Sequence, residues 1–503
     1  MAITVLRPAS SDAGPLETSD PPLTAELGRV LVSHGFAGDA VPAALGTPPA
    51  SGNAHIRDDV PLYLRRLAEP TPLHTLIKLF VLLQPVDDAA VRDALAPLSL
   101  EHIERLGLLA RGPEGVTASL RLSGCAGLVL AHDTYDRRAS VSRDHVLDVN
   151  PTTRTLAALL VRRRVRSTLD VGTGCGVLAL MTARHSERVV GVDTNPRALN
   201  FARFNAALND VHNVEFREGS LFDPVEGERF DLIACNPPYV ISPESRYIFR
   251  DGNRRGHGFC EEVVRRAPQH LEEGGYATVL CNWGIAAGED WSAPLRRWVS
   301  SSGCDTWMLC SGTQDPLTYA ATWNSSPDRA AYERALESWP AYHRELGFEK
   351  IGLGAVILRR RAEGTGWVRT DRFPDGSLEP DESLIPRIFD AQDLLSQAHT
   401  DDALLARAFV PAGHRLEQTL TLRDGRYVAG NGSQIALDGG LKFRGDVDPY
   451  TIHLLTCCDG RRTLGDISAD LAAKTATDHD ATRRATAAIC RRLVSLGFLV
   501  PAQ

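Results

Sequence analysis

The sequence predicts an α/β protein built around an open parallel sheet, with helix-rich modules before and after it. Three apolar runs predict the sheet, because each ends in glycine or polar residues: 169–176, 189–193 and 230–239. In such a sheet the carboxyl ends of the strands meet at one edge, and ligands bind in the crevice outside them. We therefore expect these three strand ends to line one site.

The first two strand ends indicate a nucleoside-type ligand. Leu169-Asp170-Val171 runs into a glycine loop and then a helix over 177–184, and glycines there let the backbone turn tightly and approach a ligand. The next strand, 188–192, ends in Asp193, a carboxylate suited to a ribose diol. A dinucleotide fingerprint would place a glycine where Val177 stands, which weakens an NAD interpretation. A glycine turn without a ligand is the plainer alternative.

The third strand end is Asn236-Pro237-Pro238-Tyr239. Because proline has no N–H to donate, the Asn236 side-chain oxygen and the Pro237 carbonyl can both accept from an NH2 group. The Tyr239 ring can stack on a flat group. This arrangement suits a planar amide or amine nitrogen that two acceptors hold and aim at an electrophile. The alternative is a proline-rich turn that only closes a strand.

From about Asp144 to Leu358 the chain resembles class I S-adenosylmethionine-dependent methyltransferases. It is most similar to their Asn-Pro-Pro-Tyr branch, which holds the HemK-type release-factor glutamine methyltransferases and the amino-methyltransferases of adenine and guanine in nucleic acid. The resemblance implies a seven-stranded Rossmann-like core and S-adenosyl-L-methionine as cofactor, with no metal. It implies catalytic roles for Asn236, Pro237 and Tyr239. It implies cofactor binding by Asp170, Gly172, Thr173, Gly174, Gly176, Asp193, Asn195, Ser220, Leu221 and Asn236.

The composition limits the number of domains and the classes of protein to which the chain can belong. The 503 residues suggest two to four domains, and 43% hydrophobic with 23% charged residues is typical of globular proteins. We find no apolar run of membrane-helix length and no secretory signal at the N-terminus. Ten scattered cysteines without a Cys-x-x-Cys pair indicate free thiols in a reducing cytoplasm rather than a disulfide scaffold or zinc site. A net charge of −8 does not suggest a nucleic-acid binder as a whole.

Before the core we expect a flexible N-terminal segment, 1–55, and a helical, winged-helix-like domain, 56–125. The expected elements are a helix at 23–34, a loop at 38–53, helices at 73–83, 89–95 and 99–106, and a hairpin of 108–110 with 116–122. The segment from Ser99 to Arg105 carries two acids and one arginine, where a DNA-recognition helix needs basic residues. A structural or protein-binding role is therefore favoured.

The expected core domain is 126–362. Its further expected elements are strands at 128–130, 213–217, 279–282, 306–310 and 355–358, helices at 154–161, 197–208 and 289–300, and a turn at 271–276. A helical insertion at 328–346 could shape the substrate pocket. The basic run 162–166 suits the negative end of a helix, and a phosphate patch for RNA is the sharper alternative.

After the core, 363–503 is predicted to be an α+β module with a hairpin and winged-helix-like part. The expected elements are a helix at 394–409, a hairpin of 418–422 with 426–429, helices at 450–455, 463–471 and 483–496, and a final strand at 497–500. The run from Leu454 to Leu464 resembles the small PqqD-type modules that bind peptides. A purely structural end-module is the other possibility.

These features predict an N-methyltransferase that acts on a planar amide or amine nitrogen of a macromolecule, either a protein glutamine or a nucleobase. The alternative is a peptide or small-molecule tailoring methyltransferase that captures its substrate with the C-terminal module. A non-catalytic cofactor-binding scaffold is a third class, which intact Asp193 and Asn236 disfavour. The acceptor and the oligomeric state are left open by the sequence.

Overall fold

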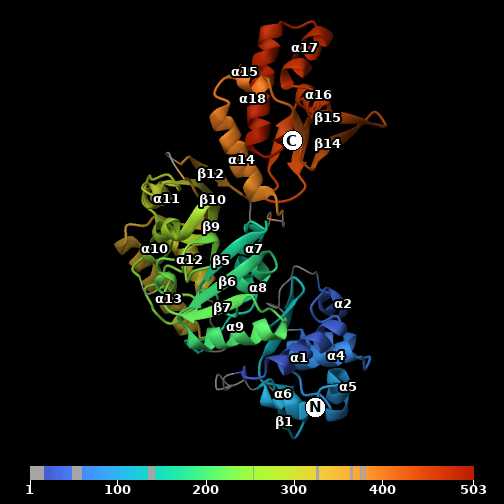
Figure 1. The fold of residues 1–503 in the computed structure, drawn as a ribbon, viewed down its shortest axis with the longest axis vertical. Coiled ribbons are helices and arrows are strands. Elements are labelled where there is room, and N and C mark those ends of the chain that lie inside the picture. The colour runs from blue at the N-terminus through green and yellow to red at the C-terminus, as the bar shows by residue number, and fades with distance from the viewer. Residues whose placement is uncertain are drawn as a thin grey trace. The chain divides into compact units, whose positions relative to one another are not determined.

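The computed structural model describes residues 16–47, 59–133, 142–252, 254–324, 328–362, 366–373, 378 and 381–502. The chain forms two compact units (Figure 1). The first comprises Met1–Leu156 and Arg164–Arg372, and the second comprises Ala157–Arg163 and Phe373–Gln503. The disorder expected of the first residues falls largely on 1–15, outside the described residues.

The first unit is organised around an eight-stranded sheet in the order β12-β10-β11-β9-β8-β5-β6-β7. Its strands are β5 (Val165–Val171), β6 (Ser186–Asp193), β7 (Val214–Glu218), β8 (Phe230–Cys235), β9 (Leu271–Ile285), β10 (Cys304–Gln314), β11 (Lys350–Arg360) and β12 (Val368–Arg372). The strands β7, β6, β5, β8 and β9 are parallel, and β11 runs antiparallel to both of its neighbours. The predicted Rossmann-like core is confirmed.

The sheet has one strand more than the seven expected, because β12 pairs in parallel with β10. Trp307 Nε1 donates to Asp371 Oδ2 at 2.7 Å, and Thr306 N donates to the Trp367 carbonyl at 2.8 Å. The first unit therefore continues to Arg372, beyond the boundary expected at 362. β12 carries mostly polar residues, so its sequence lacked the apolar run that marks a buried strand.

Helices surround this sheet, which explains why its central strands are apolar along their length. The helices of this region are α7 (Pro151–Ala158), α8 (Val177–Ala183), α9 (Pro196–Leu208), α10 (Gly258–Arg266) and α11 (Ala293–Val299), with the 3-10 turns η3 (Asp223–Val225) and η4 (Ala267–His270). Buried residues of β5, β6, β8 and β9 form one core with α10 and α11. The turn predicted at 271–276 is part of β9 in the structure, where the pairing with β8 shifts register between Phe230–Leu271 and Leu232–Tyr276.

The N-terminal part of the first unit is helical, followed by two hairpins. Its elements are α1 (Pro21–Ser33), α2 (Ala40–Leu45), α3 (Val60–Arg66), α4 (Pro72–Leu76), the π-helix η2 (Ile77–Val81), α5 (Asp88–Leu95), α6 (Leu100–Arg105), β1 (Leu109–Gly112), β2 (Gly115–Ala118), β3 (Arg121–Cys125) and β4 (Leu128–His132). The segment expected to be flexible thus contains two helices, and α2 lies where a loop was expected. Asp20 caps α1, and Gly28 lets α1 approach the Leu208 carbonyl at the end of α9. That packing depends on a residue 180 positions away, which local sequence does not reveal.

An insertion joins β10 to β11. It contains α12 (Pro316–Trp323) and α13 (Arg329–Glu345), which pack on each other. The predicted helix at 328–346 is therefore confirmed, and α12 was missed. Buried residues of both helices form a separate small core with Val240 and Ile241, the residues directly after Tyr239. The insertion thus packs against the third strand end of the predicted site.

The second unit has its own core. Its elements are α14 (Leu384–Gln397), α15 (Asp401–Leu405), β13 (Phe409–Pro411), β14 (His414–Arg423), β15 (Arg426–Leu437), β16 (Arg444–Val447), α16 (Pro449–Cys457), α17 (Leu464–Thr475), α18 (His479–Ser495) and β17 (Leu499–Pro501). The hairpin and the last three helices are confirmed. The single helix expected at 394–409 is wrong, because α14 ends at Gln397 and Thr400 caps a new helix through Ala403 N at 3.2 Å. The winged-helix likeness of this unit stays a prediction.

Candidate active site

The three predicted strand ends lie side by side. Val171 pairs with Val192 of β6 and with Cys235 of β8. Gly172 N donates to the Val192 carbonyl at 2.8 Å, and Gly219 N donates to the Asp193 carbonyl at 3.0 Å. The convergence inferred from the sequence is therefore confirmed, and the loop that holds Ser220 lies next to Asp193.

The glycine loop needs its glycines. Gly172, Gly174 and Gly176 all have positive φ, +75°, +56° and +85°, where other residues are strained. A Cβ on Gly174 would meet no atom within 4 Å, so this glycine borders open space. A Cβ on Gly176 would instead press on Ala202 of α9 at 3.1 Å. Gly174 thus leaves room for a ligand, whereas Gly176 permits close helix packing.

Asp170 and Thr173 lie beneath this loop rather than on its surface. Asp170 is 1% exposed, and its Oδ2 accepts from Thr173 Oγ1 at 2.7 Å and from Ala179 N at 3.0 Å. Burial raises the pKa of the Asp170 carboxyl to about 7, against the two hydrogen bonds, which lower it. The carboxyl group therefore fixes the fold of the loop. That these two residues touch the cofactor stays a prediction.

Asp193 closes the loop from the other side. Its Oδ2 accepts from Gly174 N at 2.8 Å and its Oδ1 from Asn195 N at 2.9 Å. Burial raises the pKa of this carboxyl, although those N–H groups lower it. A carboxylate oxygen can accept more than one hydrogen bond, so both oxygens can also receive ribose hydroxyls.

The remaining predicted cofactor residues flank Asp193. Asn195 is buried, caps α9 by accepting from Arg197 N at 3.0 Å, and donates through Nδ2 to the Asp144 carbonyl at 2.8 Å. Its capping role is thus observed. Ser220 is exposed, and Leu221 is buried at a left-handed φ of +51°.

The third strand end is the turn Asn236–Tyr239, the predicted acceptor side of the site. Asn236 Oδ1 is buried and has no hydrogen-bond partner, which leaves a desolvated acceptor at the end of β8. The Tyr239 ring meets the Trp323 ring edge-on, with centroids 6.0 Å apart. Burial raises the pKa of Tyr239 to about 12, while a hydrogen bond with Thr152 lowers it. Tyr239 is therefore a neutral ring near neutral pH.

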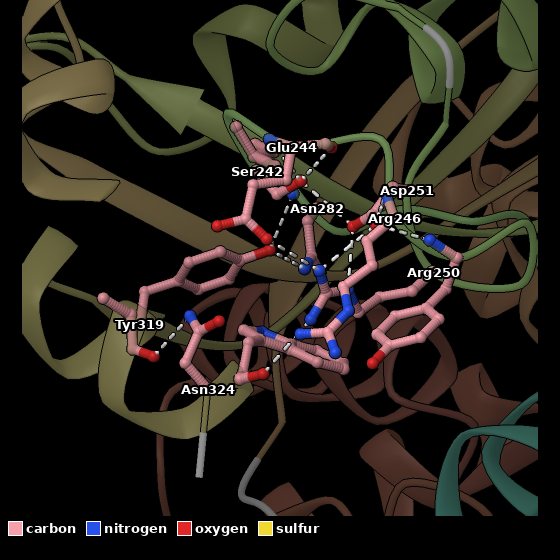
Figure 2. A network of polar contacts seen from close by, with 12 residues as sticks. Ser242, Glu244, Arg246, Arg250, Asp251, Asn282, Tyr319 and Asn324 are labelled. Carbon is pink, nitrogen blue, oxygen red and sulfur yellow. Dashed lines mark hydrogen bonds and ion pairs between the residues drawn. The ribbon is translucent and has the colours of Figure 1, made fainter. Parts of the chain in front are cut away.

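The residues that support this turn were not among the predicted site residues. Figure 2 shows Tyr319 and Asn282 joined, and Arg250, Arg246 and Ser242 gathered around Asp251. The position of Asn282 at the end of a predicted strand was a usable signal. Tyr319 gave none, because α12 was not predicted.

Comparison with known proteins decides the class of this domain. Residues 142–289 match a family model described as "Methyltransferase small domain". The release factor glutamine methyltransferase of Geobacter sulfurreducens is 36% identical over 161 residues, 29% of this chain and 53% of that protein. The corresponding enzyme of Aliivibrio fischeri is 45% identical over 154 residues, 27% of this chain and 51% of that protein.

Residues 142–289 form a class I methyltransferase domain of the HemK-like type. Its cofactor is S-adenosylmethionine. The chain spans about half the length of these two relatives, and residues 33–119 and 386–501 match two families described only as domains of unknown function. Among solved structures, a ribosomal protein L11 methylase of Lactobacillus delbrueckii subsp. bulgaricus is similar over 43% of this chain and 82% of its own, with 18% identity and a TM-score of 0.25.

The methyltransferase domain fits this cofactor. The open space at Gly174 gives the ligand access to the loop backbone, and the carboxylate of Asp193 is held at the neighbouring strand end. All ten cysteines are free thiols. Over the described ranges we find neither a group of three or more His, Cys, Asp or Glu residues that could hold a metal nor a helix long and apolar enough to cross a membrane.

Proposed function

We propose that the chain is an N-methyltransferase that modifies the side-chain amide of a protein glutamine. The observation that carries this proposal is Asn236 Oδ1, a buried acceptor without a partner, at the end of β8 next to the Pro237 carbonyl and Tyr239. A primary amide supplies the NH2 group that such acceptors need. The glutamine methyltransferase names of the relatives support the choice of an amide.

The residues have separate tasks in this reaction. The cofactor sulfonium supplies an electrophilic methyl group. Asn236 and Pro237 accept from the amide NH2 and keep its nitrogen in line with the methyl group, which lowers the entropic part of the barrier. The same two oxygens would stabilise the positive charge that develops on the nitrogen as it takes up the methyl group. One amide proton then leaves to solvent. Tyr239 packs against the flat amide.

A nucleobase acceptor is the second candidate from the sequence, and the basic run 162–166 was its main support. In the structure Arg162 donates to the Ala157 carbonyl at 3.2 Å and lies 3.8 Å from Glu382. Arg166 pairs with Asp231 at 3.4 Å. These arginines have local partners that do not require RNA. We therefore propose the protein acceptor.

The test compares wild type with Asn236→Ala, using S-adenosylmethionine and a purified bacterial release factor, and counts N5-methylglutamine by mass spectrometry. We expect methyl transfer to fall by roughly 100-fold or more, because a transition-state acceptor is lost. Cofactor affinity is measured by calorimetry as the control, because Asn236 is also a predicted cofactor contact; an orienting role requires methyl transfer to fall by much more than cofactor affinity. Full turnover in Asn236→Ala would refute the orienting role.

Asp193→Ala is the complementary variant. We expect it to lose S-adenosylmethionine binding by calorimetry, and NADH to bind neither protein. If wild type bound no methyl donor, the scaffold interpretation would replace the enzyme. If wild type binds the donor but leaves the release factor unmodified, transfer of labelled methyl groups into lysate treated with nuclease or protease identifies the class of acceptor.

A further inference from the structure

Side chains of the insertion between β10 and β11 form hydrogen bonds with the backbone just after the acceptor turn Asn236–Tyr239. Ile241 N donates to the Tyr319 hydroxyl at 3.0 Å, and the Ile241 carbonyl accepts from His343 Nε2 at 2.8 Å. Tyr319 and His343 are both fully buried. Both polar backbone groups of one residue, two positions beyond Tyr239, are thus held by side chains from α12 and α13.

The Tyr319 hydroxyl is also tied to the sheet. It accepts from Asn282 Nδ2 at 2.8 Å, and Asn282 lies near the end of β9 (Figure 2). The hydroxyl therefore joins a sheet strand, an insertion helix and the backbone of Ile241. A phenylalanine of the same shape would leave two buried donors without an acceptor, which is costly in a desolvated site.

The loop from Val240 to Asp251, which follows the turn, is held by a second set of contacts. Val240 N donates to the Arg250 carbonyl at 3.2 Å, and Tyr239 bridges Asp251. The Asp251 carboxylate accepts from Arg250 Nε at 2.8 Å and Nη2 at 3.1 Å, from Ser242 Oγ at 3.0 Å, and from two backbone N–H groups (Figure 2). Arg250 Nη1 in turn donates to the Trp323 carbonyl of α12 at 3.4 Å. The loop is closed on itself and attached again to the insertion.

We propose that Tyr319 is a positioning residue for methyl transfer, through which the insertion sets the geometry of the acceptor turn. Asn236–Tyr239 spans the short distance between Cys235, held in β8, and Ile241, held by Tyr319. If Ile241 moves, the turn between these two points moves with it. The Asn236 side-chain oxygen and the Pro237 carbonyl, which hold the acceptor nitrogen, then lose their alignment. The glycine loop that follows β5 and Asp193 at the end of β6 keep their positions. The expected fall in kcat rests on the proposed function, whereas the expected movement of the turn does not.

The insertion offers a matched control. Tyr342, on α13, also accepts a backbone N–H through its hydroxyl, from Gly256 at 2.9 Å. Tyr319→Phe and Tyr342→Phe therefore remove the same atom. The Tyr319 hydroxyl accepts from Ile241 N, next to the turn, whereas the Tyr342 hydroxyl accepts from Gly256 N, outside it. A purely structural role for the Tyr319 hydroxyl predicts a loss of stability in Tyr319→Phe, with neither faster exchange at the turn nor a lower kcat.

The first readout is amide hydrogen exchange in peptides that cover Asn236 and Tyr239 and end before Ile241. We expect Tyr319→Phe to speed this exchange by about 10-fold or more, because Ile241 N and Asn282 Nδ2 both lose their buried acceptor. Tyr342→Phe should leave the exchange unchanged. The second readout is transfer to the release factor. Tyr319→Phe should lower kcat by about 10-fold to 100-fold, as misplacement of a reacting group does, with unchanged calorimetric affinity for S-adenosylmethionine.

Unchanged exchange at the turn in Tyr319→Phe, or equal changes in both variants, would overturn the positioning role. An exchange difference with full kcat in Tyr319→Phe would also overturn it, because the turn would then move without consequence for transfer. If wild type does not modify the release factor while the exchange difference is present, the glutamine acceptor fails and the control of the turn by Tyr319 stands.

Discussion

Asp170 shows how one buried carboxyl can shape a ligand loop while making the domain sensitive to pH. Its Oδ2 holds Thr173 and the N–H of Ala179, and its Oδ1 is buried without a partner. The pKa is raised from 3.8 to about 7 by burial. The folded protein therefore keeps this proton at pH values where the unfolded chain has lost it.

The higher pKa of Asp170 in the folded state predicts how the stability of the protein changes with pH. Between about pH 4 and pH 7 the unfolded state ionises first, so the free energy of unfolding falls as pH rises, by about 1.4 kcal/mol per pH unit at most. Above pH 7 both states are ionised and the loss levels off. Asp170→Asn removes this titration. We expect the stability of wild type relative to Asp170→Asn, measured by urea unfolding, to decline from pH 4 to pH 7; a difference independent of pH would contradict the prediction.

At the scale of elements, α9 acts as the connector between the cofactor loop and the N-terminal hairpin. Asn205 accepts from Ala131 N at 2.7 Å, donates to the Ala131 carbonyl at 3.0 Å, and also donates to the Cys175 carbonyl of the glycine loop at 2.9 Å. One turn later, Asn209 makes the same paired contact with Val129, at 2.9 and 2.7 Å. Both amides complete the edge of β4, and Asn205 alone of the two reaches the loop.

Substitution of Asn205 and of Asn209 separates the support of β4 from the support of the glycine loop. Asn205→Ala and Asn209→Ala should each destabilise the first unit by about 1–3 kcal/mol, because backbone groups lose their partners. Asn205→Ala should in addition weaken S-adenosylmethionine binding by roughly 10-fold, about 1.4 kcal/mol, whereas Asn209→Ala should leave it unchanged. Calorimetry and thermal unfolding measure both quantities. Equal cofactor affinity in the two variants would show that Asn205 only supports β4.

At the scale of the whole molecule, the division of the chain into two compact units implies two unfolding events. The core of the second unit is formed by α14–α18 with β13, β15 and β17, and the seven residues Ala157–Arg163 belong to that unit. Their apolar members Leu159, Leu160 and Val161 are buried. The chain thus leaves the first unit and returns to it between α7 and β5.

This division predicts how the cofactor affects heat stability. Scanning calorimetry of the full chain should show two transitions, because each core unfolds cooperatively. S-adenosylmethionine at 100 times its Kd should stabilise the first unit by about 2.7 kcal/mol and raise its transition by a few degrees, and the other transition should not move. A single transition that shifts as a whole would mean that the two units unfold together.

The sequence by itself determined that three polar strand ends share one edge of the sheet, where we place the cofactor and the acceptor. Glycines after a strand, Asp193 at the next strand end and Asn236-Pro237-Pro238-Tyr239 are short patterns whose backbone chemistry is local, so the carboxyl ends of parallel strands could be brought together without a structure. The hairpin at Asp424-Gly425 could also be predicted, because its turn depends on local backbone chemistry.

Only the tertiary structure decided which residues hold those patterns in place. Tyr319 and His343 meet Ile241 across 78 and 102 positions, and Asn205 meets Ala131 across 74. Asp170 faces inward, β12 extends the sheet, and 157–163 joins the second unit. Such contacts leave no periodic or turn signal in the chain, because their energy comes from burial and from pairing of polar groups that are distant in sequence.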